Sequence, residues 1–298
     1  MSSILRALRV ILVTLVVACA GIATWVFIAS ERRLGQVHDM TVAPVAARTD
    51  SASVARGAYL FQSISCTLCH GEDGGGAIIQ RDKMLGTIAG PNLTRGRGGT
   101  GVQRSDIDWV RAIRRGVRPN GTSLIVMPSE VFTHLSESDV AAILGYLRQI
   151  PAVDREVPES KFGPMGRALL AAGKLNILVA PKTPRYEAPA NPPASGTIEY
   201  GRYLADVSGC HGCHGYGLSG GRVAGPPGLP PASNLTPTGI GRWTETDFTR
   251  AMREGKRPDG STIDPFMPWE VFRKISGEDL HTLWMYLQSV PAREFGNK

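Results

Sequence analysis

The sequence contains two copies of one pentapeptide pattern, Cys66-Thr67-Leu68-Cys69-His70 and Cys210-His211-Gly212-Cys213-His214. The pattern Cys-x-x-Cys-His is typical of the covalent attachment of a c-type haem. In such a site each cysteine forms a thioether to a haem vinyl group, and the histidine binds the iron as its proximal ligand. We therefore expect two covalently attached haems, held by Cys66, Cys69, His70, Cys210, Cys213 and His214.

The composition is compatible with two haem domains. The chain has 298 residues, of which 42% are hydrophobic, and this length is enough for two domains of about 100 residues each. The formal charge of +7 comes from basic residues that are scattered along the chain rather than grouped in blocks. With no nucleic-acid-binding motif in the sequence, we expect no nucleic-acid partner.

An apolar run over residues 10–28 predicts how the chain meets the membrane. As a helix this run would cover about 28 Å, close to the hydrocarbon thickness of a bilayer. A cleaved signal peptide would have a shorter apolar core. The stretch Val16-Val17-Ala18-Cys19 resembles a lipoprotein cleavage box, but the sequence after it stays apolar. We therefore expect an uncleaved transmembrane anchor at residues 1–30 and a tether at residues 31–52.

The two halves of the chain align with each other, with only short insertions and deletions between them. Three pairs of segments match: residues 56–60 with 200–204, residues 91–94 with 233–236, and residues 111–121 with 250–260. This duplication predicts one haem domain at residues 53–152 and a second at residues 195–298.

Sequence signals show where the last helix of each copy begins and ends. A capping-box-like Ser-x-x-Asp begins at Ser136 and again at Ser276. The apolar stripe that follows has helical spacing and stops before a proline, at Pro151 or Pro291. These signals predict the last helix of each copy.

Glycines predict further features of the two copies. A middle helix is expected near residues 105–115 and its equivalent near residues 245–254, each ending at a glycine. Gly57 and Gly201 lie in the first helix of each copy, where a missing side chain would let the last helix cross closely. We expect three or four short helices around each haem and almost no strand.

The segment between the copies, residues 153–194, is predicted to be a linker. Residues 162–179 are apolar, and residues 180–195 are rich in proline without periodicity. We expect an extended strap lying against one domain, with the Pro-rich part holding the domains apart. The alternative is a second membrane contact by residues 168–179, a run too short to span a bilayer.

The sixth ligand of each iron separates electron carriers from enzymes. A Met thioether closes the site, whereas an open position would admit peroxide or oxygen. Met127 and Met267 occupy matched Met-Pro positions in the two copies, so we expect both to bind iron. The rival, bis-His ligation, is disfavoured because the other histidines do not recur. The methionines expected to fill the core instead are Met84, Met165, Met252 and Met285.

Each half resembles a class I cytochrome c domain, and the whole chain is similar to membrane-anchored di-haem cytochromes c. The nearest likeness is to the cytochrome c subunits of periplasmic bacterial alcohol and aldehyde dehydrogenases. It covers roughly residues 53–298 and rests on both pentapeptides, the Asn-Leu-Thr stretches at 92–94 and 234–236, residues 239–244 and both Met-Pro loops. Those subunits commonly carry three haem domains, whereas this chain has two. The resemblance implies an all-α fold of two tandem class I cytochrome c domains after an N-terminal transmembrane helix.

The resemblance also implies roles for residues near each haem. In class I cytochromes a proline carbonyl accepts a hydrogen bond from the proximal His ring. Pro91 matches that proline, whereas the second copy has Ser233 there, whose carbonyl would substitute for it. Trp243 resembles a haem-propionate contact, and the first copy has Arg104 at about that place. The two haems are therefore not expected to have identical potentials.

The expected function is single-electron transfer rather than catalysis. The donor would be a periplasmic dehydrogenase or a quinol-oxidising complex, and the acceptor a terminal oxidase or a soluble cytochrome. Since haem attachment to this motif takes place on the exported side in bacteria, we place the haem domains in the periplasm, with a single pass through the inner membrane. The alternative is a di-haem cytochrome c peroxidase, which needs one haem open to peroxide. A Met-Pro loop in both copies argues against it.

Overall fold

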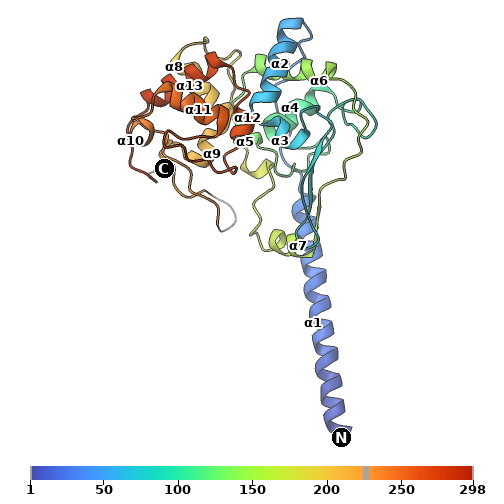
Figure 1. Ribbon diagram of the computed structural model, residues 1–298. Helices are drawn as coiled ribbons and strands as arrows, with labels where there is room; N and C mark the ends of the chain where they lie inside the picture. Colours follow the sequence, from blue (N-terminus) through green and yellow to red (C-terminus); the bar gives the residue numbers. More distant parts are fainter. Residues whose placement is uncertain (1, 224–227, 297–298) are drawn as a thin grey trace.

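The computed structural model describes residues 2–223 and 228–296 (Figure 1). Helix α1 (Ser2–Leu34) projects alone from the body of the molecule, as Figure 1 shows. Its portion Ser3–Leu34 is long and apolar enough to cross a membrane, so α1 could be a membrane anchor or a signal sequence. The helix continues past residue 30, where the predicted anchor ends.

Most of the body consists of short helices in an order that occurs twice. The N-terminal unit contains α2 (Ser51–Ser63), α3 (Cys66–His70), α4 (Asp106–Arg115), α5 (Ser129–Phe132) and α6 (Glu137–Gln149). The C-terminal unit contains α8 (Ile198–Val207), α9 (Cys210–His214), α10 (Pro237–Ile240), α11 (Glu245–Glu254), α12 (Trp269–Phe272) and α13 (Gly277–Ser289). Apart from α10, each helix of one unit has an equivalent in the other.

The predicted close crossing of first and last helices is present in both units. Helix α2 packs on α6, and α8 packs on α13. A Cβ atom added to Gly57 would lie 2.0 Å from the Ala142 carbonyl oxygen, and one added to Gly201 would lie 2.4 Å from that of Thr282. Because no side chain fits at either position, glycine sets the distance between the two helix axes.

The predicted helix starts and stops are also confirmed. The Ser136 hydroxyl accepts the Asp139 N–H at 3.1 Å, and the Ser276 hydroxyl accepts the Asp279 N–H at 3.0 Å. Helix α4 ends at Gly116 (φ 62°) and α11 at Gly255 (φ 64°), both in the left-handed conformation that glycine adopts without strain.

The expectation of almost no strand was wrong for one segment. Strands β1 (Ala77–Asp82), β2 (Gly86–Gly90) and β3 (Lys161–Phe162) form an antiparallel sheet in that order. Residues alternate along β2 between buried and half-buried, which is the pattern of a strand with one covered face. Its end lies against the first pentapeptide helix, because a Cβ on Gly90 would come within 2.0 Å of the Cys69 carbonyl oxygen.

The linker lies against one domain, as the sequence predicted, but it is not extended throughout. The Glu137 N–H donates to the Pro189 carbonyl at 2.9 Å, and the Val179 N–H donates to the Leu124 carbonyl at 3.1 Å. The linker contains a helix, α7 (Pro164–Ala171), and a short 3-10 turn, Ala180–Lys182. Pro164 lies in the first helical turn, where its missing N–H costs no hydrogen bond. Helix α7 packs against α1 rather than against either helical unit (Figure 1).

The predicted tether lies on the N-terminal unit after α1 ends. The His38 N–H donates to the Gly121 carbonyl at 2.9 Å, and the Arg48 N–H donates to that of Ala141 at 3.0 Å. Apolar residues of this segment, Val42 and Val45 among them, pack against the hydrophobic core. This contact ties the end of α1 to the N-terminal unit.

The two units contact each other directly through a reciprocal pair of hydrogen bonds, which we call the tyrosine clasp. Tyr59 Oη donates to Asp279 Oδ2 at 2.5 Å, and Tyr203 Oη donates to Asp139 Oδ2 at 2.7 Å. Each tyrosine comes from the first helix of one unit, and each aspartate from the last helix of the other. The prediction that the Pro-rich segment holds the domains apart was therefore wrong.

Candidate haem sites

Each pentapeptide forms a separate five-residue helix that carries two cysteines and a histidine. Helix α3 follows Ser65 (φ 74°) and α9 follows Gly209 (φ 77°), so the chain turns sharply before each helix. Residues three apart lie on one face of a helix, which places the two thiols of each helix side by side. None of these four cysteines forms a disulfide.

Each proximal histidine is oriented by a main-chain carbonyl. His70 Nδ1 lies 3.0 Å from the Pro91 oxygen, and His214 Nδ1 lies 2.7 Å from the Ser233 oxygen. Because a carbonyl can only accept, Nδ1 is the protonated nitrogen in both rings, and Nε2 is the nitrogen that could bind a metal. The predicted hydrogen bonds are confirmed in both units, including the one to Ser233.

The protonation of these groups fits haem binding. Burial raises the pKa of Cys66 to about 12, and burial followed by the Asp206 carboxylate raises that of Cys210 to about 12, so both thiols are neutral. Burial lowers the pKa of His70, although its bond to Pro91 opposes this effect. A neutral imidazole is the form of histidine that binds a metal.

The two predicted methionine ligands lie in the loops that lead into α5 and α12. Met127 and Met267 are both half-buried and pack against the hydrophobic core that Cys66 and Cys210 also touch. The loops differ in path, since the Met127 N–H donates to Ile125 and the Met267 N–H donates to Asp264. Ligation of iron by either methionine stays a prediction.

Arg104 is a half-buried arginine close to His70, and the half-buried Arg118 lies close to Arg104; neither was predicted to bind haem. The Arg104 charge helps to lower the pKa of His70, and its guanidinium stacks over the Trp109 ring at 5.2 Å from the centroid. Burial lowers the pKa of both Arg104 and Arg118, and Arg104 lowers that of Arg118 further. Two neighbouring cations removed from water would favour an anionic group such as a haem propionate.

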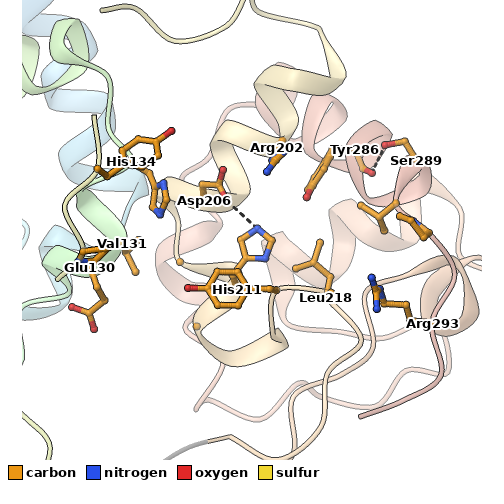
Figure 2. Close-up of a pocket in the computed structure, with 18 of the residues that line it drawn as sticks. Glu130, Val131, His134, Arg202, Asp206, His211, Leu218, Tyr286, Ser289 and Arg293 are labelled. Atoms are coloured by element: carbon orange, nitrogen blue, oxygen red, sulfur yellow. Dashed lines mark hydrogen bonds and ion pairs between the residues drawn. The ribbon is translucent and has the colours of Figure 1, made fainter. Parts of the chain in front are cut away.

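A cavity of about 990 Å³ lies between the two units (Figure 2). Its walls include Val131 and His134 from the N-terminal unit and Arg202 and His211 from the C-terminal unit. All eight predicted haem residues are among those that the structure describes, and none of them lines this cavity. The cavity nevertheless borders the second pentapeptide helix, because His211 and Gly212 line it.

The interface between the two units has a lysine at one position and a histidine at the equivalent position of the other half. Lys274 of the C-terminal unit donates to Gln62 at 2.8 Å and to Glu72 at 2.6 Å, both in the N-terminal unit. At the equivalent place on the other side stands His134, which packs on Tyr186 with 4.7 Å between ring centroids. The shorter imidazole leaves space where the lysine closes the interface.

Comparison with known proteins relates one part of the chain to cytochromes c. The family model described as cytochrome c matches residues 54–151. This part of the chain is similar to a cytochrome c domain. The match contains the first pentapeptide and Met127.

Three relatives are named as cytochrome subunits of dehydrogenases. The chain is 33% identical over 136 residues to the fructose dehydrogenase cytochrome subunit of Gluconobacter japonicus, which covers 41% of this chain and 28% of the relative. It is 37% identical over 97 residues to the cytochrome c subunit of alcohol dehydrogenase (quinone) of Gluconobacter oxydans, covering 30% and 20%. It is 36% identical over 97 residues to the gluconate 2-dehydrogenase cytochrome c subunit of Pantoea cypripedii, covering 30% and 22%. The chain thus spans less than a third of the length of each.

Proposed function

We propose that the chain is a di-haem cytochrome c that transfers single electrons. The observation that carries this proposal is the duplicated proximal geometry, in which each pentapeptide histidine donates Nδ1–H to a carbonyl at the equivalent place. One haem would be attached to Cys66 and Cys69, and its iron would be bound by His70 and Met127. The other would be attached to Cys210 and Cys213 with His214 and Met267. The domains would be residues 53–152 and 195–298, joined by the linker 153–194.

When bound, haem supplies the one-electron couple of its iron. The residues of the chain bind and tune it. The carbonyls of Pro91 and Ser233 fix the rings of His70 and His214 and make each Nε2 a stronger donor. A thioether at the opposite face would leave no position for peroxide or oxygen. No nucleophile or proton-transfer group is needed for this task.

We propose that α1 anchors the chain in the bacterial inner membrane, with the haem domains in the periplasm. The donor would be a periplasmic dehydrogenase or a quinol-oxidising complex, and the acceptor a terminal oxidase or a soluble cytochrome. A dehydrogenase is supported by relatives that are named as cytochrome subunits of fructose, alcohol and gluconate dehydrogenases.

The haem count and the axial ligands can be tested together. The intact mass and the absorption of the reduced pyridine complex should give two haems per chain, falling to one in Cys66→Ala/Cys69→Ala and in Cys210→Ala/Cys213→Ala. Both oxidised haems should be low-spin with a weak thioether-to-iron charge-transfer band. Met127→Ala should convert one haem to high spin, and Met267→Ala the other. A bis-His spectrum in the unaltered protein would contradict the proposal.

The peroxidase alternative predicts a different reaction with peroxide. In stopped-flow mixing of the half-reduced protein, a carrier with two closed sites should react slowly with hydrogen peroxide. Fast turnover would support the peroxidase and exclude the carrier.

The dehydrogenase partner requires a separate test. An affinity-tagged chain purified from its native membrane should bring a dehydrogenase subunit with it, and deletion of the gene should lower substrate-driven oxygen uptake. Unchanged uptake would contradict a role in that pathway.

A further inference from the structure

We propose that the chain touches the membrane at a second place, where the turn between β1 and β2 and helix α7 lie on the surface of an anionic bilayer. We call this surface the membrane platform and define it as residues 78–85 together with α7. The inference rests on the proposed anchoring by α1 and deepens it, because it sets how the N-terminal unit sits on the membrane.

Helix α7 is fixed at the end of the apolar part of α1. Arg167 donates to the Ser30 hydroxyl at 2.9 Å and to Glu31 at 2.7 Å. Its guanidinium also stacks over the Phe27 ring at 4.9 Å from the centroid. The apolar run of α1 ends at residue 28, so α7 lies at the level where a spanning helix leaves the hydrocarbon (Figure 1).

The turn between β1 and β2 is fixed to α7 by main-chain hydrogen bonds. The Met84 carbonyl accepts the N–H groups of Met165 at 3.0 Å and Gly166 at 3.2 Å. The Leu85 carbonyl accepts the N–H of Gly163 at 3.0 Å. The turn, α7 and the end of α1 are thus one continuous surface rather than three independent segments.

This surface exposes apolar side chains that the core does not use. Met84 and Met165, which the sequence analysis placed in the core, are 49% and 48% exposed. The prediction was wrong for both. They are accompanied by further exposed apolar residues, namely Ile78, Ile79 and Leu85. Exposed apolar groups gathered at one place mark a contact surface in a folded protein.

The polar residues around this apolar patch are mostly cationic, so the surface that the platform would bind is an anionic lipid bilayer. Glu31 is neutralised by Arg167, and the Asp82 carboxylate accepts the N–H groups of Met84 and Leu85. The exposed basic residues on these segments and their immediate neighbours are Arg32, Arg33, Arg81, Lys83, Lys161 and Lys174. Basic side chains beside an apolar patch bind acidic headgroups while the patch enters the interface.

Photocrosslinking of the full chain in lipid nanodiscs tests this proposal. The discs would contain phosphatidylcholine and phosphatidylglycerol, with a trace of phosphatidylglycerol that carries a diazirine near its headgroup. Mass spectrometry should find crosslinks on residues 78–85 and on α7, in addition to those on α1. With discs and probe of phosphatidylcholine alone, crosslinks on the platform should fall several-fold. Equal crosslinking would overturn the role of the basic residues.

Matched variants separate the platform from the anchor. Met84→Glu should lower crosslinks on residues 78–85 at least fivefold without changing those on α1. Met165→Glu serves as a second variant if the first does not fold. The control is Ile198→Glu, because Ile198 is 47% exposed and begins α8, which lies away from α7 in Figure 1. This control should leave every crosslink unchanged.

The location of the crosslinks distinguishes failure of the platform from failure of the anchor. Crosslinks confined to α1 would overturn the platform and leave the proposed anchor intact. A chain that does not enter the discs, or that lacks crosslinks on α1, would overturn the anchor and the platform together, whereas haem content and electron transfer would remain as proposed.

Discussion

At the scale of single residues, the two pentapeptide histidines depend on main-chain oxygens, each held in place by a buried asparagine. The Asn92 side chain donates to the Val153 carbonyl at 2.7 Å and accepts the Thr94 N–H at 2.9 Å. The Asn234 side chain donates to Arg293 at 2.7 Å and accepts the Thr236 N–H at 2.9 Å. Each asparagine directly follows the residue whose carbonyl binds the histidine, and this arrangement fixes the path of the loop.

Serine can replace proline in the second candidate site, where Ser233 occupies the position of Pro91. The resemblance to class I cytochromes c identified a proline, Pro91, as the partner of His70. The group that accepts the hydrogen bond from His70 is, however, the main-chain carbonyl of that residue. Any residue supplies the same oxygen if the loop keeps its path, and Asn234 keeps it. By contrast, the environment of Arg104 could not be foreseen, because a sequence shows a charge but not whether water reaches it.

We predict that Asn92→Ala and Asn234→Ala each lower the free energy of unfolding by about 2–3 kcal/mol, because each leaves buried main-chain partners unpaired. Guanidinium unfolding followed by far-UV circular dichroism measures this loss. Asn191→Ala is the control, since Asn191 is exposed and should change stability by less than about 0.5 kcal/mol. A loss no larger than that of the control would contradict the role of the asparagine.

We predict that Arg104→Gln lowers the midpoint potential of the first haem. A cation near the iron favours the reduced state, in which the site carries one more electron, and its removal favours the oxidised state. A loss of about 1 kcal/mol corresponds to roughly 40 mV for a one-electron couple. Spectroelectrochemical titration should show a shift of this order in one haem only.

The matched control for the potential is Arg97→Gln, because the Arg97 side chain is 75% exposed and solvent screens its charge. This substitution should leave the midpoint potentials of both haems unchanged within experimental error. A shift of both haems in Arg104→Gln, or an upward shift, would count against a local electrostatic effect.

At the scale of elements, the helices that the sequence predicted are those whose signals are local. Helices α6 and α13 begin at a serine cap and end just before a proline, and both signals lie within the segment itself. Strand β1 gave no such signal, because Ile78 and Ile79 are adjacent and both exposed. Helix α7 has only 8 residues, too few to be stable alone, and it depends on α1 for its packing.

We predict that Gly57→Ala and Gly201→Ala each destabilise the protein by about 1–3 kcal/mol, because the added methyl forces two packed helices apart. Gly277→Ala is the matched control. Gly277 lies in the first turn of α13, and a Cβ there would meet no atom within 4 Å. The control should be neutral or more stable, since alanine favours a helix. Equal stability of all three variants in guanidinium unfolding would contradict the close crossing.

At the scale of the whole molecule, the tyrosine clasp makes one body of the two units. The backbone N–H of Ser276 donates to Tyr59 Oη at 3.1 Å, and that of Ser136 donates to Tyr203 Oη at the same distance. Each tyrosine hydroxyl therefore both accepts and donates at the start of the last helix of the other unit. Such an arrangement holds the two candidate haem sites at a fixed separation, which the proposed relay between them would require.

We predict that Tyr59→Phe/Tyr203→Phe separates the thermal unfolding of the two units. Each substitution removes the tyrosine donor from a buried aspartate, at a cost of about 1.5–3 kcal/mol, while the apolar ring contacts remain. Asp139 keeps its hydrogen bonds from Arg56 in the variant. Calorimetry should change from one transition to two, with both haems still low-spin. Tyr216→Phe is the control, because Tyr216 is 91% exposed. A single transition in the double variant would contradict the clasp.

The clasp also predicts how stability falls at alkaline pH. Burial, and then the hydrogen bond to Asp279, raise the pKa of Tyr59 to about 12, and burial together with Asp139 raises that of Tyr203 as well. An unfolded tyrosine loses its proton near pH 10, so between about pH 10 and 12 the unfolded chain binds fewer protons than the folded chain. Stability from Tyr59 is therefore fully present below pH 10 and is lost as the pH rises toward 12.

Because other groups also titrate between pH 10 and 12, the measurement is the difference in free energy of unfolding between the unaltered protein and Tyr59→Phe, taken from guanidinium unfolding at each pH. The variant, which has no phenol at this position, should lose less stability across the interval, and identical losses would show that Tyr59 is not buried against Asp279 in solution.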